Sequence, residues 1–271
     1  MAAFAKFHDR LPKAALLWWS LNCSIAFLIT LPSMGLAQSG APGTIDQIKP
    51  SIVAVGTFQR TRNPQFRFLG TGFAIGDGSF VATNYHVVPK ILDTERNESI
   101  VVVLPSPGTE GQVRMARKVA SESSADLVLL KIDGPPLRPL RLGNSERVRE
   151  GETYLFTGFP IGQVIGLFPV THRAMISAVT PIAIPAERAD QLNTRALRQL
   201  SEGAYAIFQL DATAYPGNSG SPLFHPESAE VVGIINMVFV KGTKETALTE
   251  PSGISYAIPI QYLKNLLERT R

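Results

Sequence analysis

The stretch of sequence that decides the fold is DATAYPGNSGSPL, residues 211–223. A serine hydroxyl is a weak nucleophile at neutral pH, so it needs an adjacent base and an exposed, sharply turned backbone. The glycines around Ser219 permit such a turn, and they allow the N–H groups of Gly217 and Ser219 to face one point where an oxyanion could sit. Taken alone, the stretch also fits a glycine-rich surface turn.

Two further residues stand at the ends of apolar runs earlier in the chain. His86 lies in ATNYHVV, residues 82–88, and histidine has the pKa that a general base needs near neutral pH. Asp126 opens the apolar run DLVLLKI, where a carboxylate is costly unless it pairs with a group such as an imidazole N–H. Each residue alone could be structural, as a partly buried histidine or a solvated aspartate. Together with Ser219 they predict a catalytic triad.

The order His, Asp, Ser along the chain is that of the trypsin-like double-barrel serine proteases, and the local motifs resemble the HtrA (or Deg) group within them. The resemblance runs from about residue 48 to residue 267. The motifs that carry it are GTGF at 70–73, ATNYHVV at 82–88, ADLVLLKI at 125–132, GFPIG at 158–162, the stretch at 211–223 and SYAIPI at 255–260. The chain departs from the group at Tyr85, where asparagine is usual, and at Ser221, where glycine is usual.

The resemblance implies an all-β fold of two perpendicular antiparallel six-stranded barrels followed by a C-terminal helix. The first barrel would span residues 48–140 and carry His86 and Asp126. The second barrel, with the helix, would span residues 141–271 and carry Ser219, so that the active cleft lies between the barrels. We expect no C-terminal PDZ domain, because the sequence ends at residue 271.

The resemblance also assigns the oxyanion N–H groups to Gly217 and Ser219. It implies a pocket for the substrate side chain that is lined by Ala214, Ile234, Ile235 and Asn236. Since none of these residues is acidic, we expect cleavage after small or medium aliphatic residues rather than after lysine or arginine.

Short apolar runs between turn signals independently indicate β structure. The expected strands are 52–55, 72–75, 80–83, 100–104, 127–132, 153–158, 170–179, 206–210, 231–240 and 254–259. Tight hairpin turns are expected at 76–78 and 106–108. Apolar residues at helical spacing predict an amphipathic helix within 187–203 and another that begins near Tyr262. The helix within 187–203 fits a lid, a subunit contact or a surface decoration.

Residues 1–37 read as a signal peptide. Lys6, Arg10 and Lys13 precede an apolar stretch at 14–31, and a small-residue ending predicts cleavage after Ala37. The alternative is an uncleaved membrane anchor, because the apolar stretch is long for a signal peptide. Residues 38–47 then form a linker, and the protein is exported to the periplasm or secreted.

Removal of the signal would also remove Cys23, the only cysteine, and would lower the net charge from +4 to +2 through the loss of three basic residues and one acidic residue. The mature chain would then hold no disulfide and no cysteine-based metal site. No basic run interleaved with aromatic residues is present, so we expect no nucleic-acid partner. We expect polypeptide substrates, no metal or organic cofactor, and membrane association only if the signal is uncleaved. The resemblance further implies a homotrimer.

The sequence therefore predicts a serine endopeptidase that forms an acyl-enzyme on unfolded or exposed protein segments. A second hypothesis is a peptide-binding or chaperone module that holds peptides without cutting them. A third is a protease that stays inactive until a partner orders the glycine-containing segment 158–171.

Overall fold

The computed structural model describes residues 40–105, 111–181, 206–236 and 253–270. The predicted signal peptide at 1–37, the turn at 106–108 and the helix within 187–203 lie outside the described residues. Residues 39–271 group as one compact unit.

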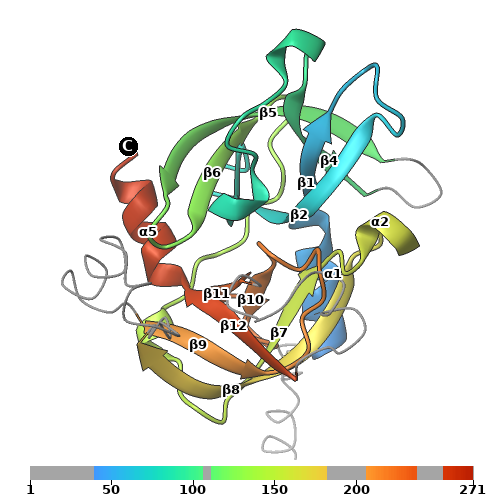
Figure 1. The fold of residues 1–271 in the computed structure, drawn as a ribbon. Helices are drawn as coiled ribbons and strands as arrows, with labels where there is room; N and C mark the ends of the chain where they lie inside the picture. Colours follow the sequence, from blue (N-terminus) through green and yellow to red (C-terminus); the bar gives the residue numbers. More distant parts are fainter. Residues whose placement is uncertain (1–39, 106–110, 182–205, 237–252, 271) are drawn as a thin grey trace, which may run out of the picture. The chain divides into compact units, whose positions relative to one another are not determined.

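The first half of this unit is a closed barrel of six antiparallel strands, drawn in the upper part of Figure 1. The strands are β1 (Ile52–Phe58), β2 (Phe66–Ile75), β3 (Phe80–Asn84), β4 (Ser99–Leu104), β5 (Gln112–Glu122) and β6 (Leu127–Ile132). They pair in the order β1-β2-β3-β6-β5-β4. Short 3-10 turns follow β3 (η2, Tyr85–Val87) and precede β4 (η3, Thr94–Arg96).

The second half repeats this topology strand for strand. Its strands are β7 (Thr153–Gly158), β8 (Val170–Pro181), β9 (Ala206–Asp211), β10 (Pro222–Phe224), β11 (Val231–Asn236) and β12 (Ile254–Pro259). They pair in the order β7-β8-β9-β12-β11-β10 and close a second barrel. The short helix α2 (Gly162–Ile165) follows β7, the 3-10 turn η4 (Ser145–Arg147) precedes it, and helix α5 (Ile260–Glu268) follows β12.

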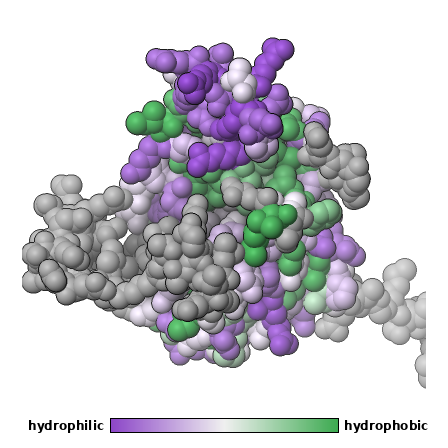
Figure 2. Space-filling model, turned by 45° about the vertical axis from the view of Figure 1, so that its right-hand side comes forward, coloured by the Kyte–Doolittle hydropathy of each residue, from purple (hydrophilic) through white to green (hydrophobic). Residues whose placement is uncertain are grey.

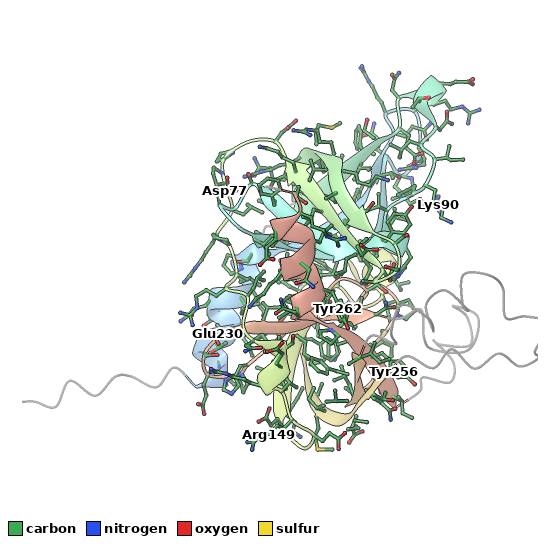
Figure 3. All side chains as sticks on the ribbon, turned by 90° about the vertical axis from the view of Figure 1, so that its left-hand side faces the viewer. Asp77, Lys90, Arg149, Glu230, Tyr256 and Tyr262 are labelled. Carbon is green, nitrogen blue, oxygen red and sulfur yellow. The ribbon has the colours of Figure 1, made fainter. Side chains whose placement is uncertain are left out.

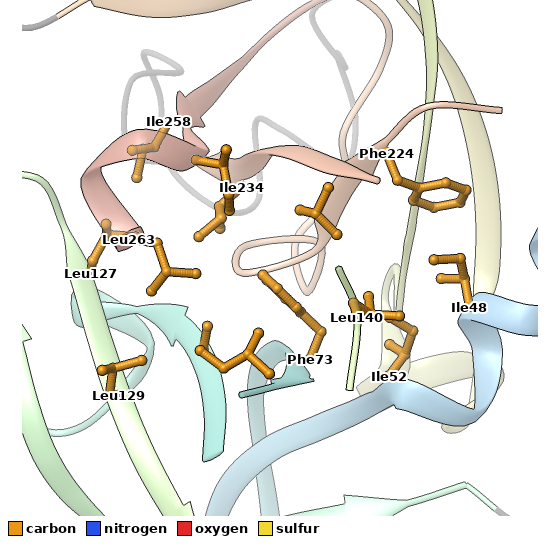
Figure 4. Packing of buried hydrophobic residues seen from close by; sticks show 14 of the residues in the cluster. Ile48, Ile52, Phe73, Leu127, Leu129, Leu140, Phe224, Ile234, Ile258 and Leu263 are labelled. Atoms are coloured by element: carbon orange, nitrogen blue, oxygen red, sulfur yellow. The ribbon is translucent and has the colours of Figure 1, made fainter. Parts of the chain in front are cut away.

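Three apolar clusters explain why most strands read as unbroken hydrophobic runs. In β1, Val53 and Val55 point into the cluster inside the first barrel, whereas Ile52 and Ala54 belong to a cluster that also holds residues of the second barrel. Alternate residues of a strand face opposite sides, so a strand that is buried on both sides needs apolar residues at every position. Figure 4 shows this shared cluster, where Phe73 and Leu127 of the first barrel meet residues of the second barrel and of α5.

The helix α5 closes the shared cluster from one end. Leu263 and Leu266 are buried in it, and Arg269, which follows the helix, forms an ion pair of 2.9 Å with Glu122 of the first barrel. The labelled side chains in Figure 3 show the arrangement: Asp77 lies on the first barrel, Arg149 and Glu230 lie on the second, and Tyr262 of α5 lies between them. The C-terminal helix therefore contacts both barrels.

The predicted fold class is confirmed: two closed six-stranded antiparallel barrels and a C-terminal helix. The structure adds two strands that the sequence reading omitted, β5 and β10. It also corrects the predicted linker at 38–47, because residues 41–48 form the helix α1 (Ala41–Ile48). Pro42 lies in the first turn of this helix, where its fixed φ suits the helical backbone, and Ile48 is buried in the shared cluster.

On the face shown in Figure 2, the described residues are mostly polar, with hydrophobic residues visible at a few places. The most exposed large apolar side chains among the described residues are Ile91, Val164 and Phe168, at 88%, 78% and 65% exposure. Within the described residues, no helix has the length and apolar character needed to cross a membrane.

Candidate active site

Asp126 and His86 are in direct contact in the first barrel. The Asp126 Oδ2 atom lies 2.6 Å from His86 Nδ1, and Asp126 Oδ1 accepts a hydrogen bond of 2.9 Å from the His86 backbone N–H. His86 sits in the turn η2 after β3, and Asp126 immediately precedes β6, which pairs with β3. The pairing of these two strands is what brings the residues together.

The backbone of Asp126 is itself held in an uncommon conformation. Its φ is +53°, in the left-handed region that aspartate tolerates better than most residues. Its carbonyl accepts hydrogen bonds from the Tyr85 N–H at 3.0 Å and from the Asn84 side chain at 3.2 Å. These bonds fix the direction of the carboxylate toward His86.

A third residue supports the carboxylate from the second barrel. Asn236, at the end of β11 and fully buried, donates from Nδ2 to Asp126 Oδ2 over 2.9 Å. These bonds hold the carboxylate with one oxygen facing His86 Nδ1. A carboxylate in that place favours the imidazole tautomer with the proton on Nδ1, which leaves the Nε2 lone pair available as a base.

Ser219 lies at the end of a tight turn between β9 and β10 and is 6% exposed. The turn contains Gly217 at φ +103° and Gly220 at φ +89°. A Cβ on Gly217 would lie 2.2 Å from the Phe159 carbonyl oxygen, and a Cβ on Gly220 would lie 2.0 Å from the Thr71 carbonyl oxygen. Only glycine fits at these two positions, both for its φ and for the close approach of the backbone.

Thr71 of β2 ties this turn to the first barrel. Its Oγ1 donates to the Gly217 carbonyl at 2.7 Å and accepts from the Phe159 N–H at 3.1 Å. Its backbone N–H donates to the Ser219 carbonyl at 2.9 Å. A fully buried residue of the first barrel therefore holds two carbonyls of the turn that carries Ser219.

Two further bonds tie other backbone groups of the turn to the second barrel. The Ile161 N–H donates to the Pro216 carbonyl at 2.7 Å, and the Gly220 N–H donates to the Ile235 carbonyl at 3.0 Å. In the described part of the chain, the N–H groups of Gly217 and Ser219 have no hydrogen-bond acceptor. The turn thus leaves free the two donors that the resemblance assigns to an oxyanion hole.

The backbone of Ser219 and the residue that follows His86 both lie close to Gly70 of β2. A Cβ on Gly70 would lie 3.0 Å from the Ser219 carbonyl oxygen and 2.8 Å from Cγ2 of Val87, the residue after His86. No hydrogen bond joins the Ser219 and His86 side chains among the described residues. Such bonds are often long in free enzymes and shorten when substrate binds.

The four residues predicted to line the substrate pocket lie in different surroundings. Ala214 is 8% exposed and belongs to the cluster inside the second barrel, as does Ile235. Ile234 packs in the cluster shared by both barrels, and the Asn236 amide points to Asp126. Ile234, Ile235 and Asn236 are fully buried as whole residues, so Ala214 is the only one of the four with any exposed surface.

The site has no neighbouring group that looks like a metal centre. Over the ranges that the structure describes, no three His, Cys, Asp or Glu side chains are grouped as metal ligands. A second histidine, His172, lies in β8 and is stacked on Phe156 of β7 at 4.8 Å between ring centroids. Burial lowers the pKa of His172, so its ring is neutral at pH 7.

The sequence matches the family described as "Trypsin-like peptidase domain" over residues 70–234. The chain belongs to the trypsin-like peptidase family. The matched range includes His86, Asp126, Ser219 and Thr71.

Curated relatives within this trypsin-like peptidase family include two proteins named "Probable periplasmic serine endoprotease DegP-like". The protein from Halomonas elongata is 30% identical over 206 residues, which cover 76% of this chain and 35% of the relative. The protein from Pseudomonas putida is 32% identical over 200 residues, which cover 73% of this chain and 34% of the relative. The chain thus spans about a third of the length of these relatives.

Solved structures with the same fold include the "HtrA-type protease AlgW with decapeptide", with a TM-score of 0.61 and 24% identity over 85% of this chain and 67% of that one. The "HtrA-type protease AlgW with tripeptide" has a TM-score of 0.60 and 23% identity over 84% of this chain and 62% of that one. The resemblance to the HtrA group that the sequence motifs predicted is therefore confirmed.

Two contributors to the site were not identified from the sequence. Thr71 lies in the motif at 70–73, but nothing in that motif shows that its hydroxyl reaches Gly217. Asn236 was assigned to the pocket, whereas the structure pairs its amide with Asp126. Both contacts cross between the barrels, so they depend on how the barrels dock and leave no local signal in the sequence.

Proposed function

We propose that this protein is a serine endopeptidase with Ser219 as nucleophile, His86 as general base and Asp126 as the residue that orients His86. The observation that carries the proposal is the Asp126–His86 contact of 2.6 Å beside a turn that presents Ser219 and two unpaired N–H groups. A nucleophile, a base and an orienting carboxylate in this order are the requirements of acyl transfer by serine.

The reaction proceeds in two stages. His86 Nε2 takes the proton from Ser219 Oγ as the oxygen attacks a peptide carbonyl, and Asp126 stabilises the imidazolium that forms. The N–H groups of Gly217 and Ser219 donate to the oxyanion of the tetrahedral intermediate. His86 returns the proton to the leaving amine, and water then repeats the sequence to release the acyl group from Ser219.

The substrates in this proposal are unfolded or exposed segments of polypeptides. In this proposal Ala214, Ile234, Ile235 and Asn236 line the pocket for the residue before the scissile bond, and since none of them is acidic, a small or medium aliphatic side chain is favoured over lysine or arginine. The names of the relatives support a periplasmic location, with residues 1–37 as the export signal. We retain the division into residues 48–140 and 141–271, and the homotrimer, as parts of the same proposal.

The test is cleavage of an unfolded reporter protein by the chain from residue 38 onward, in parallel with labelling by a fluorophosphonate probe. Ser219→Ala, His86→Ala and Asp126→Asn are the variants. We expect cleavage and labelling in the parent protein, and loss of both in Ser219→Ala. Asp126→Asn should retain the fold and lose several orders of magnitude in rate, because the amide reverses the preferred tautomer of His86.

Binding of the reporter without cleavage or labelling in the parent protein would refute the proposal and support a non-cleaving peptide-binding module. Labelling without cleavage would show an intact nucleophile whose substrate or activating partner is missing from the assay. Circular dichroism of each variant separates loss of chemistry from loss of fold.

A further inference from the structure

Beneath the proposed nucleophile turn lie three buried polar atoms that nothing in the described structure satisfies. They are Oδ1 and Nδ2 of Asn218 and Oγ of Ser221, and each has less than 1 Å² of accessible surface and no hydrogen-bond partner. The two residues flank Ser219 and Gly220 and are themselves fully buried. Buried polar groups without partners are rare in folded proteins, and each one calls for a physical explanation.

Three side chains lie around Gly158, at the place where any other residue would have its Cβ. A Cβ on Gly158 would lie 2.0 Å from Ser221 Oγ, 2.8 Å from Asn218 Oδ1 and 2.9 Å from Thr71 Oγ1. The Ser221 hydroxyl and the Asn218 carboxamide therefore approach one point, and that point exists because residue 158 is glycine. Thr71 Oγ1 donates to the Gly217 carbonyl and accepts from the Phe159 N–H, and it makes no hydrogen bond to Ser221 or Asn218.

We propose that Ser221 is a positioning residue: its hydroxyl hydrogen-bonds the Asn218 carboxamide, directly or through one trapped water molecule, and so stiffens the oxyanion turn. The proposal rests on the proposed function, since it concerns the same turn. A small rotation of a hydroxyl or one internal water is the usual way in which buried groups this close are satisfied.

The proposed contact between Ser221 and Asn218 affects catalysis through the peptide group that joins Asn218 to Ser219. The peptide between Asn218 and Ser219 carries the Asn218 carbonyl, which accepts from the Ser221 N–H at 3.0 Å, and the Ser219 N–H, which is one of the two oxyanion donors. The Asn218 backbone N–H is held by the Tyr215 carbonyl at 3.0 Å. Fixing the side chain of Asn218 as well removes the remaining rotation of this plane, so the donor is aligned before the oxyanion forms.

Replacing Ser221 with a residue that lacks a hydroxyl tests this link. A glycine has no hydroxyl and leaves the carboxamide of Asn218 without this partner. Ser221→Gly and Ser221→Ala should therefore have the same effect on catalysis, although only Ser221→Ala retains the Cβ.

The experiment is a double-mutant cycle on kcat and KM with Ser221→Ala, Asn218→Ala and the double variant, using the unfolded reporter. We expect Ser221→Ala to lower kcat about tenfold with KM within about twofold, as for the loss of one hydrogen bond that matters in the transition state. The double variant should be no slower than Asn218→Ala alone, because the two residues act as a unit. The rate of labelling by the fluorophosphonate should fall in parallel with kcat.

Ser51→Ala is the matched control, because Ser51 Oγ is also buried without a partner but lies in the 3-10 turn before β1, among residues assigned no role in catalysis. It should leave kcat unchanged. An unchanged kcat in Ser221→Ala, or effects of the two single variants that multiply in the double variant, would overturn the proposal. If the parent protein neither cleaves nor labels, the proposed function fails, and a crystal structure that resolves waters still decides the link. An Asn218 carboxamide without any bond to Ser221 or to a shared water would overturn it.

Discussion

Replacing Thr71 with valine tests how the barrels hold the nucleophile turn. Valine has nearly the same shape as threonine, so the change removes the hydroxyl and leaves the packing of a fully buried side chain in place. Two bonds are lost, one from the Phe159 N–H at 3.1 Å and one to the Gly217 carbonyl at 2.7 Å. Phe159 is fully buried, so its N–H bears the full cost of an unsatisfied donor, about 1–3 kcal/mol. Gly217 is half-buried, so water can partly replace its bond, at about 0.5–1.5 kcal/mol.

The sum is a loss of about 1.5–4.5 kcal/mol in the free energy of unfolding, measured from urea denaturation followed by circular dichroism. The turn would also lose one of its anchors, and kcat should fall, with the loss of a whole oxyanion donor, about 10²–10³-fold, as the upper limit. Thr44→Val is the control, because Thr44 is also fully buried but its hydroxyl has no partner. That substitution should be neutral or stabilising. If Thr71→Val cost no more than Thr44→Val, the hydroxyl of Thr71 would not be holding the turn.

Three other substitutions follow from single contacts. Asn236→Leu removes the 2.9 Å bond to Asp126 Oδ2, and the loss of a bond to a charged group, about 1.5–3 kcal/mol, should lower kcat/KM about 10- to 150-fold in a reporter assay. Burial lowers the pKa of His172, so as pH falls below 6.5 the unfolded chain takes up a proton there before the folded chain does, and the parent protein loses stability. His172→Phe should lose less stability over the same pH range. Urea midpoints between pH 8 and pH 5 would measure this, and equal slopes in both proteins would contradict it. The hydrogen bond from Thr57, first among several causes, lowers the pKa of Glu98, so the parent protein loses this stabilisation as the carboxylate is protonated. Glu98→Gln should therefore make the stability of the protein less sensitive to acid between pH 5 and pH 3.

The strands were predictable where burial on both faces leaves an unbroken apolar run. In β6, Leu127 and Leu129 face the cluster shared by the barrels while Val128 and Leu130 face the interior of the first barrel, so the first four positions are all apolar. Strand β5 was missed because much of it is exposed and carries several charged residues, such as Arg117 and Lys118. Strand β10 was missed because it has three residues, and its pairing is fixed by β7 and β11 rather than by its own pattern.

The helix α1 shows how a turn signal and a helix start can look alike. The glycine and proline at 40–43 were read as a linker, yet Pro42 occupies the first turn of a helix. What decides between the two is whether the residues that follow can bury an apolar side, and Ile48 does so in the shared cluster. Whether Ile48 can be buried depends on the other residues of the shared cluster, which lie far away in the sequence.

The site divides in the same way, between what is local and what depends on docking. His86 and Asp126 follow and precede paired strands of one barrel, so their contact is a consequence of strand pairing. The bonds that complete the arrangement cross between the barrels: Asn236 reaches Asp126, and Thr71 reaches Gly217.

Because these bonds cross between the barrels, the geometry of the site depends on how the barrels dock. Asn236 lies two residues after Ile234, and Thr71 lies two residues before Phe73. Ile234 and Phe73 both belong to the cluster shared by the barrels. A shift of one barrel against the other would move the carboxylate away from its amide and the turn away from its anchor at the same time. Because hydrogen bonds weaken steeply with small changes in distance and angle, such a shift would disable the site before it exposed the core of either barrel. The apolar cluster between the barrels therefore fixes the relative position of the barrels. The bonds of Asn236 and Thr71 at its edge then fix the positions of the proposed catalytic groups.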